Sequence, residues 1–253
     1  MDVPMSAHSC DKGLILREVP YKDADMMLTV LTETNGKISA AARGVRRKSS
    51  RMSAALQHMA YSEFTFFESS GRYTINEAEP IELFYPVRQD IDKLALASYF
   101  AELLEVTADA ETVNPELLRL GLNALYALSN LPVDTRALKA AFELRISMYA
   151  GYAPTMGNSC AVCGKSYNDM FFNLNDGAVC CKGCCGFDAL PIDAGALAAI
   201  NHVNTCDLKR IFSFSLGEES LKKLSAVSEA YLMRHFDRRF STLSFYKSLS
   251  SIK

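Results

Sequence analysis

The chain has 253 residues, of which 49% are hydrophobic and 22% charged, and these fractions are typical of a folded globular protein rather than a disordered one. The formal net charge of −2 excludes a protein that binds nucleic acid with its whole surface, because such a protein would be basic. Any contact with phosphate must therefore come from local clusters of lysine and arginine. No apolar run reaches the ~18 residues of a membrane span, and Met1 to Cys10 lacks the features of a secretory signal, so we expect a cytosolic protein without membrane contact.

The first 80 residues are typical of a small β-barrel. Short apolar or alternating runs predict five strands, and Pro20 is expected to end the first of them. Asn35-Gly36 predicts a tight hairpin between the second and third strands. Five short strands in so short a segment favour a barrel of the OB type. The predicted strands are 12–18, 26–32, 37–42, 61–68 and 72–76.

A basic loop, residues 43–51, joins the third and fourth predicted strands. No acidic residue occurs between Glu33 and Glu63, so this part of the chain carries only positive charge. A flexible cationic loop on a barrel is suited to follow a phosphate backbone, and arginine binds phosphate through two parallel hydrogen bonds. Simple solvated charge is the alternative interpretation. The residues predicted to bind DNA are Lys37, Arg43, Arg46, Arg47, Lys48 and Arg51.

Other residues of the predicted barrel give weaker signals. Asp23 and Asp25 precede the second strand and are more typical of a turn or a cap than of an ion site. The aromatic residues of the fourth and fifth strands offer stacking surfaces, but alternation turns about half of them toward the core. These aromatic residues are Tyr61, Phe64, Phe66, Phe67 and Tyr73.

After the barrel, the apolar residues recur at helical spacing. This pattern predicts helices over 90–110, from Pro115 to about Leu128, from a cap at Asp134 to Tyr149, over 193–203 and over 218–240. The fold class is therefore α+β, an N-terminal OB-type barrel followed by an α-helical domain with an embedded four-cysteine zinc finger. We divide the chain into a barrel (1–80), a first helical part (81–157), an irregular cysteine module (158–187) and a second helical part (188–253).

The cysteine module predicts a metal site. Cys160 and Cys163 form one CxxC pair, Cys181 and Cys184 form another, and the separation of the pairs is that of a zinc ribbon or knuckle. Two cysteines three residues apart in a tight turn can direct both sulfurs at one ion, and a second turn completes a tetrahedron. Glycines at 164 and 183 suit such turns with positive φ. Four thiolates leave no open coordination position, so we expect a structural Zn²⁺.

Two further cysteines leave the ligand set open. Cys180 could replace Cys181, and Cys185 could replace Cys184, with a different turn. We prefer Cys181 and Cys184 because only they have the two-residue spacer. Buried thiols or disulfides are the alternative interpretation of the whole cluster, and disulfides are uncommon in the cytosol.

No motif of a known enzyme class occurs in the chain. The patterns GxxxxGK[ST], GxGxxG after a strand, GxSxG, HExxH and HxE…PCxxC are all missing. We therefore expect a non-enzymatic protein. A zinc-braced protein-interaction scaffold without direct DNA binding is the first alternative, and a nuclease or hydrolase with unrecognised carboxylates is the second.

Several segments of the chain, and the order in which they occur, resemble the RecO family of bacterial recombination mediators. The stretch 13–16 followed by 21–25 is similar to the family's first strand and its Tyr-x-Glu-x-Asp stretch, with Asp at position 23. Residues 28–38 resemble its next hairpin, and 42–47 resemble its Ala-Lys/Arg-Gly-Ala-Arg-Arg. Leu56-Gln57-His58 resembles its Leu-Gln-Pro with histidine in place of proline, and Tyr152-Ala153-Pro154 resembles the lead-in to its zinc cysteines.

The resemblance implies an N-terminal OB fold, a helical domain and an embedded zinc finger. It implies binding of single- and double-stranded DNA, annealing of complementary strands, and work with RecR, and often RecF, to load RecA onto DNA coated by single-stranded DNA-binding protein. Contact with the acidic, apolar C-terminal tail of that coating protein, and a place in the bacterial cytoplasm with the nucleoid, are implied as well. The spare cysteines at 10, 180, 185 and 206 and the acidic pI depart from the family's pattern.

Overall fold

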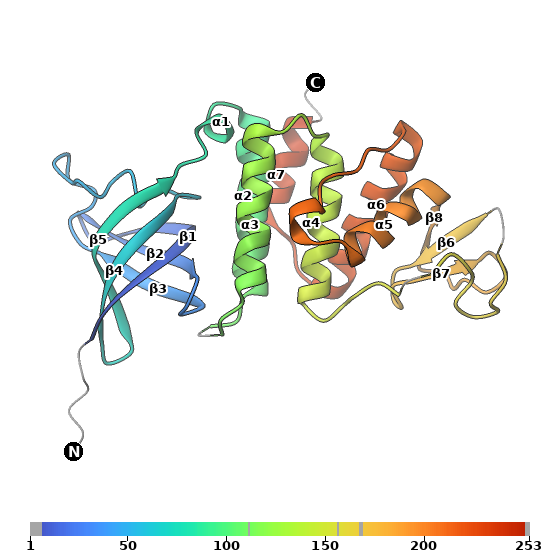
Figure 1. Cartoon of the computed structure of the whole chain (residues 1–253), viewed down its shortest axis with the longest axis horizontal. Helices are drawn as coiled ribbons and strands as arrows, with labels where there is room; N and C mark the ends of the chain where they lie inside the picture. The colour runs from blue at the N-terminus through green and yellow to red at the C-terminus, as the bar shows by residue number, and fades with distance from the viewer. Residues whose placement is uncertain (1–6, 111, 156, 167–168, 251–253) are drawn as a thin grey trace, which may run out of the picture. The chain divides into compact units, whose positions relative to one another are not determined.

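The computed structural model describes residues 7–110, 112–155, 157–166 and 169–250 (Figure 1). Two compact units form the molecule. Unit 1 consists of Met1–Asn130 and Thr242–Lys253, and unit 2 consists of Leu131–Ser241. The finer division into four segments that the sequence suggested stays a prediction.

Five strands close a barrel in unit 1, which confirms the predicted barrel. All neighbouring strands run antiparallel except β3 and β5, which are parallel. The long strand β1 closes the barrel, because its first half pairs with β4 and its second half with β2. Around the barrel the order is β1 (Ala7–Tyr21), β2 (Asp25–Thr32), β3 (Lys37–Ala42), β5 (Arg72–Glu82) and β4 (Tyr61–Ser69).

Side chains alternate between the inside and the outside of the barrel along each strand, and the inward-facing ones fill it. Phe64 and Phe66 of β4 are fully buried with Ile75 of β5, whereas Phe67 is only half-buried on the outward face. A close approach of β1 and β2 occurs at Gly13, where a Cβ atom would lie 2.7 Å from Val30 Cγ1. The barrel interior is therefore close-packed, and a ligand can contact the barrel only on its outer surface.

The first strand continues beyond the point where the sequence predicted its end. Pro20 pairs with Met26, and the strand reaches Tyr21. This part of β1 has a partner only on the β2 side, and proline, which lacks an N–H, is tolerated on such an edge. The prediction that Pro20 ends the strand was therefore wrong.

The predicted hairpin at Asn35-Gly36 is present between β2 and β3. Gly36 has a φ of +67°, and the Thr32 N–H donates to its carbonyl at 2.8 Å. The buried carboxylate of Asp11 accepts hydrogen bonds from Thr34 and Asn35 and fixes the turn. The hairpin thus follows from the left-handed conformation that glycine tolerates.

Four helices complete unit 1. Asp90 caps α2 by accepting from the N–H groups of Asp92 and Lys93. The last helix was not predicted. The expected helix over 218–240 ends at Phe236 because Asp237 is left-handed, with a φ of 44°. The helices are α1 (Tyr85–Arg88), α2 (Ile91–Thr107), α3 (Pro115–Asn130) and α7 (Ser241–Ser250).

Unit 2 contains three mutually packed helices, a short 3-10 helix and a small sheet. The sheet has the strand order β7-β6-β8. Two of its strands, β6 and β7, lie in the region expected to be irregular, so that expectation was incomplete. The helices are α4 (Thr135–Tyr149), α5 (Ala194–Thr205), α6 (Glu218–Phe236) and η1 (Leu208–Arg210). The strands are β6 (Met170–Asn173), β7 (Ala178–Cys181) and β8 (Ala189–Ile192).

Buried charges join α4 to α6 in unit 2. The Lys139 ammonium lies 2.7 Å from Glu143 and 2.9 Å from Glu229, and Ser228 donates to Glu143 at 2.8 Å. Since buried charges are tolerated only when paired and hydrogen-bonded, this network specifies how the two helices face each other. Among the helices that the structure describes, none is both long and apolar enough to cross a membrane.

Candidate metal centre and nucleic-acid interface

The first CxxC pair lies in a tight turn that backbone hydrogen bonds define. The Gly164 N–H donates to the Cys160 carbonyl at 2.8 Å, and the Cys160 N–H donates to Lys165 at 2.9 Å. A further bond, from Ala161 to the Val179 carbonyl, ties the turn to β7. Gly164 has a φ of +73°, so the positive φ expected there is confirmed.

The second CxxC pair begins at the last residue of β7. The N–H groups of Cys184 and Cys185 both donate to the Cys181 carbonyl at 2.9 Å, so this carbonyl closes the turn. Gly183 does not have a positive φ, and the expectation for that residue was wrong. The turn is closed by two convergent N–H donors and needs no left-handed residue.

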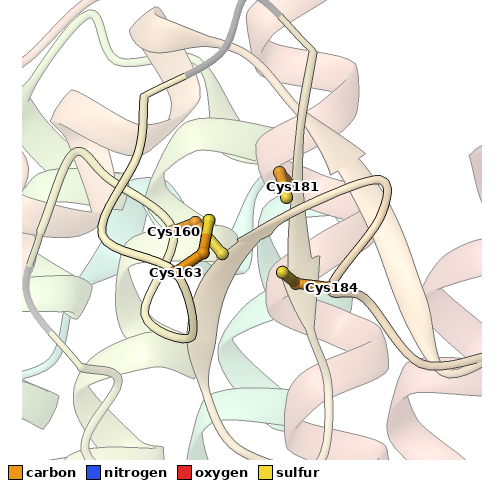
Figure 2. A group of neighbouring side chains, drawn as sticks. All are labelled: Cys160, Cys163, Cys181 and Cys184. Atoms are coloured by element: carbon orange, nitrogen blue, oxygen red, sulfur yellow. The ribbon is translucent and has the colours of Figure 1, made fainter.

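The two turns bring four sulfurs together. The Sγ atoms of Cys160, Cys163, Cys181 and Cys184 all lie within 4.8 Å of one another, and Figure 2 shows the two pairs on separate turns. Four sulfurs at about 2.3 Å from one ion stand about 3.8 Å apart, so a small contraction would complete a tetrahedron. Cys160 and Cys181 are buried whereas Cys163 is exposed. This group can therefore hold one metal ion at the surface of unit 2.

Two thiols of this group have pKa values that are shifted in opposite directions. Hydrogen bonds from the backbone N–H groups of Cys163 and Cys181 lower the pKa of Cys160 to about 6. Hydrogen bonding with the Cys181 side chain, followed by burial, raises the pKa of Cys184 to about 12. Coupled thiols lose their protons stepwise, and a bound divalent cation favours the fully deprotonated set.

The two flanking cysteines form a disulfide with each other. Cys180 and Cys185 are bonded, with their Cα atoms 5.4 Å apart. Because each sulfur is already bonded, neither is available as a ligand, which supports the preference for Cys181 and Cys184 over their neighbours. The sequence did not predict this pairing.

The basic loop is fixed at its start by the turn between β1 and β2. The Gly44 N–H donates to the Asp25 carboxylate at 2.8 Å, and the Arg46 N–H donates to the Ala24 carbonyl at 3.0 Å. Asp25 therefore anchors the loop from the first residue of β2, whereas Asp23 lies in the turn, as expected for it.

The chain between β3 and β4 is folded as successive turns. The Arg47 N–H donates to Gly44, and the Ser50 N–H donates to Arg47. Val45 and Leu56 are buried in the barrel core. The sequence suggested a flexible loop, whereas the structure has a segment packed onto the barrel through its apolar residues.

Five of the six predicted cations lie together on this segment. All five are exposed, and none takes part in an ion pair with any residue that the structure describes. Lys37 lies apart from them at the opposite end of β3, where its ammonium donates to the Glu105 carbonyl at 2.6 Å. The five grouped residues are Arg43, Arg46, Arg47, Lys48 and Arg51.

Comparison with known proteins identifies relatives along almost the whole chain. A family model described as recombination protein O N terminal matches residues 5–84, and one described as recombination protein O C terminal matches residues 88–244. A DNA repair protein RecO of Acetivibrio thermocellus is 33% identical and covers 95% of this chain and 97% of its own. A protein with the same name from Alkaliphilus metalliredigens is 32% identical and covers 94% of this chain and 98% of its own. Another, from Bacillus pumilus, is 27% identical and covers 96% of this chain and 94% of its own.

Proposed function

The chain belongs to the RecO family of DNA repair and recombination proteins, and from this membership we propose that it binds DNA through the basic loop of its barrel. The observation that carries the proposal is a group of five exposed cations without a carboxylate partner among the described residues. Guanidinium and ammonium groups without a carboxylate partner can neutralise phosphates and release counterions. Binding is therefore expected for both single- and double-stranded DNA and for any base sequence.

We further propose that the protein anneals complementary strands without making or breaking covalent bonds. The loop holds one strand by its phosphates, and the lowered charge reduces its repulsion of an incoming strand. The bases stay accessible for pairing. In this proposal the protein acts with RecR, and with RecF where it is present. Together they load RecA onto DNA that is coated by single-stranded DNA-binding protein, and our protein contacts the C-terminal tail of that coating protein. It acts in the bacterial cytoplasm at the nucleoid.

The metal group has a supporting role in this proposal. We infer that Cys160, Cys163, Cys181 and Cys184 hold a structural Zn²⁺, because four thiolates suit zinc and fill its coordination shell. Both sulfur-bearing turns lie in a short segment with a three-stranded sheet, and the ion would link the turn before β6 to the turn after β7. The ion thus stabilises unit 2 and takes no direct part in DNA binding or strand annealing.

The decisive experiment removes the loop charges. Changing Arg46, Arg47 and Lys48 to Ala is expected to weaken binding of all oligonucleotides about equally and to reduce the slope of log K against log[salt] by about 2, since each lost phosphate contact contributes about 0.7–0.9. The measurement is fluorescence anisotropy at several salt concentrations. The matched control is the Ala variant at Arg119, Lys209 and Lys222, which loses the same charge outside the barrel.

Strand annealing, with and without single-stranded DNA-binding protein, tests the mechanism itself. Equal annealing by the wild type and the loop variant would remove the loop from the mechanism. Salt-insensitive or missing DNA binding with retained partner binding would favour an interaction scaffold. Loss of a labelled oligonucleotide that depends on divalent metal would identify a nuclease.

A further inference from the structure

A shallow cleft of about 830 Å³ lies on the barrel. Two arginines, Arg43 and Arg72, and two aromatic rings, His8 and Phe67, line it together with hydroxyl and amide side chains of β4 and β5. We call it the β4–β5 cleft. Arg72 was not among the residues predicted to bind DNA.

Strand register explains how these side chains meet. His8 of β1 is opposite Phe67 of β4, and Phe67 is opposite Thr74 of β5, so the three form one row across the barrel. The row faces outward, because Phe66 and Ile75, the next residues along β4 and β5, are buried. The rings of His8 and Phe67 have centroids 5.2 Å apart at an interplanar angle of 50°.

The two arginines reach the cleft from separate strands. Arg72 opens β5 after the turn at Ser69–Gly71, and Arg43 follows the last residue of β3. In the parallel pairing of β3 with β5, Ala40 is opposite Tyr73 and Ala42 is opposite Ile75. Arg72 therefore lies at one end of the paired stretch and Arg43 at the other, and both line the same cleft. Among the described residues neither arginine has an ion-pair partner.

The rest of the β4–β5 surface has the opposite charge. Glu63 of β4 is opposite Glu79 of β5, Glu77 is opposite Thr65, and the three glutamates are exposed. A polyanion is therefore repelled from this part of the two strands and attracted to the cleft. From the cleft, Arg43 leads directly into the basic loop, so one strand of nucleic acid can contact both.

The chemistry of the cleft matches one unpaired nucleotide. Aromatic rings stack on the flat face of any base, and guanidinium groups pair with phosphate. A duplex keeps its bases stacked inside and cannot offer such a face. We propose that the β4–β5 cleft binds one unpaired nucleotide of a DNA strand, with its base against His8 and Phe67 and its phosphates near Arg43 and Arg72. This inference rests on the proposed DNA binding by the loop and adds selectivity for single strands.

The test compares single-stranded and duplex oligonucleotides of equal length. Phe67→Leu is expected to weaken single-strand binding about 5- to 100-fold, the usual effect of losing one stacked base, and to leave duplex binding unchanged. Arg72→Gln is expected to weaken single-strand binding and to lower its salt slope by about 0.7. Tyr126→Leu and Arg119→Gln, which change exposed residues of α3, are the matched controls.

A second measurement uses only the wild type and does not depend on the folding of a variant. A base analogue whose fluorescence falls on stacking is expected to be quenched on binding, and an abasic oligonucleotide is expected to bind the wild type about 5- to 100-fold more weakly than the intact one. Wild-type single-strand affinity in Phe67→Leu, or equal binding of abasic and intact strands, would overturn the inference even if the loop variant loses DNA binding. Salt-insensitive or missing binding by the wild type would instead overturn the proposed function, and the cleft with it.

Discussion

At the scale of single residues, His58 couples stability to pH. The residue is half-buried, and its Nε2 is shielded from solvent and has no hydrogen-bond partner among the described residues. Burial, and then the charge of Arg88, lowers the pKa of His58 to about 4. Its pKa in an unfolded chain is about 6.5, so between these values the unfolded state binds a proton that the folded state does not. Stability contributed by the neutral ring is therefore present above about pH 6.5 and is lost as the pH falls toward 4.

We predict that the wild type loses about 2 kcal/mol of its free energy of unfolding through His58 between pH 7 and pH 5. The variant His58→Gln, which cannot titrate there, should lose correspondingly less over the same interval. Urea denaturation at the two pH values measures the difference. His8→Gln changes an exposed histidine and should keep the wild-type pH dependence. An unchanged pH dependence in His58→Gln would show that this ring is not the responsible group.

The backbone of His58 also accounts for a departure from the family pattern. The resemblance placed His58 where the family has proline. Here the His58 N–H donates to the Glu18 carboxylate at 3.2 Å, and its carbonyl accepts from Arg88 at 2.6 Å. Proline has no N–H and could not make the first of these bonds. The histidine thus links the segment before β4 to β1 in a way that proline would not allow.

At the scale of elements, the turn after β7 decides which cysteines can bind metal. We predict that Cys181→Ser lowers zinc affinity by at least about 100-fold, because it removes one of four ligands, and that the double variant Cys180→Ser/Cys185→Ser keeps one zinc per chain. Zinc content after dialysis against a competing chelator is the measurement. Zinc loss in the double variant but not in Cys181→Ser would mean that the ligand set is wrong.

Elements built from local patterns were predictable from the sequence. The five strands, the hairpin at Gly36, the cap at Asp134 and the spacing of the two CxxC turns all depend on residues close together in the chain. The same locality explains why the spacing selected four cysteines whose sulfurs lie together, whereas their binding of a metal stays a proposal. The Cys180–Cys185 bond was missed because spacing gives no disulfide connectivity.

Non-local features could not be predicted in this way. The parallel pairing of β3 with β5 places Arg43 and Arg72 at the two ends of one cleft, but neither strand's pattern indicates its partner. Asp237 has a left-handed conformation and ends α6 before the predicted limit at residue 240. Aspartate tolerates that conformation, and no residue pattern in the sequence indicated it. Lys37 belongs by sequence to the cationic segment, yet its contact with Glu105 depends on a helix far along the chain.

At the scale of the whole molecule, unit 1 depends on α7. Leu243 is buried, and the Thr242 N–H and hydroxyl both donate to the Glu102 carboxylate of α2. We predict that a chain ending at Phe240 loses about 2–4 kcal/mol of stability in unit 1 from these contacts. Hydrogen exchange of the α2 amides measures the loss.

Leu243→Ala retains the helix and the hydrogen bonds of Thr242, so it should have a smaller effect than the truncation. Protection of α2 that is the same in the truncated and full-length proteins would show that α7 does not support unit 1. Exchange in α5, which belongs to unit 2, provides the internal reference.

The discontinuity of unit 1 has a consequence for biosynthesis. Unit 2 is one uninterrupted stretch, whereas unit 1 requires residues from both sides of it. On the ribosome, the barrel strands and α2 emerge first but Glu102 meets Thr242 only after all of unit 2 has been translated. The contacts that complete unit 1 therefore cannot form before the whole of unit 2 has been synthesised.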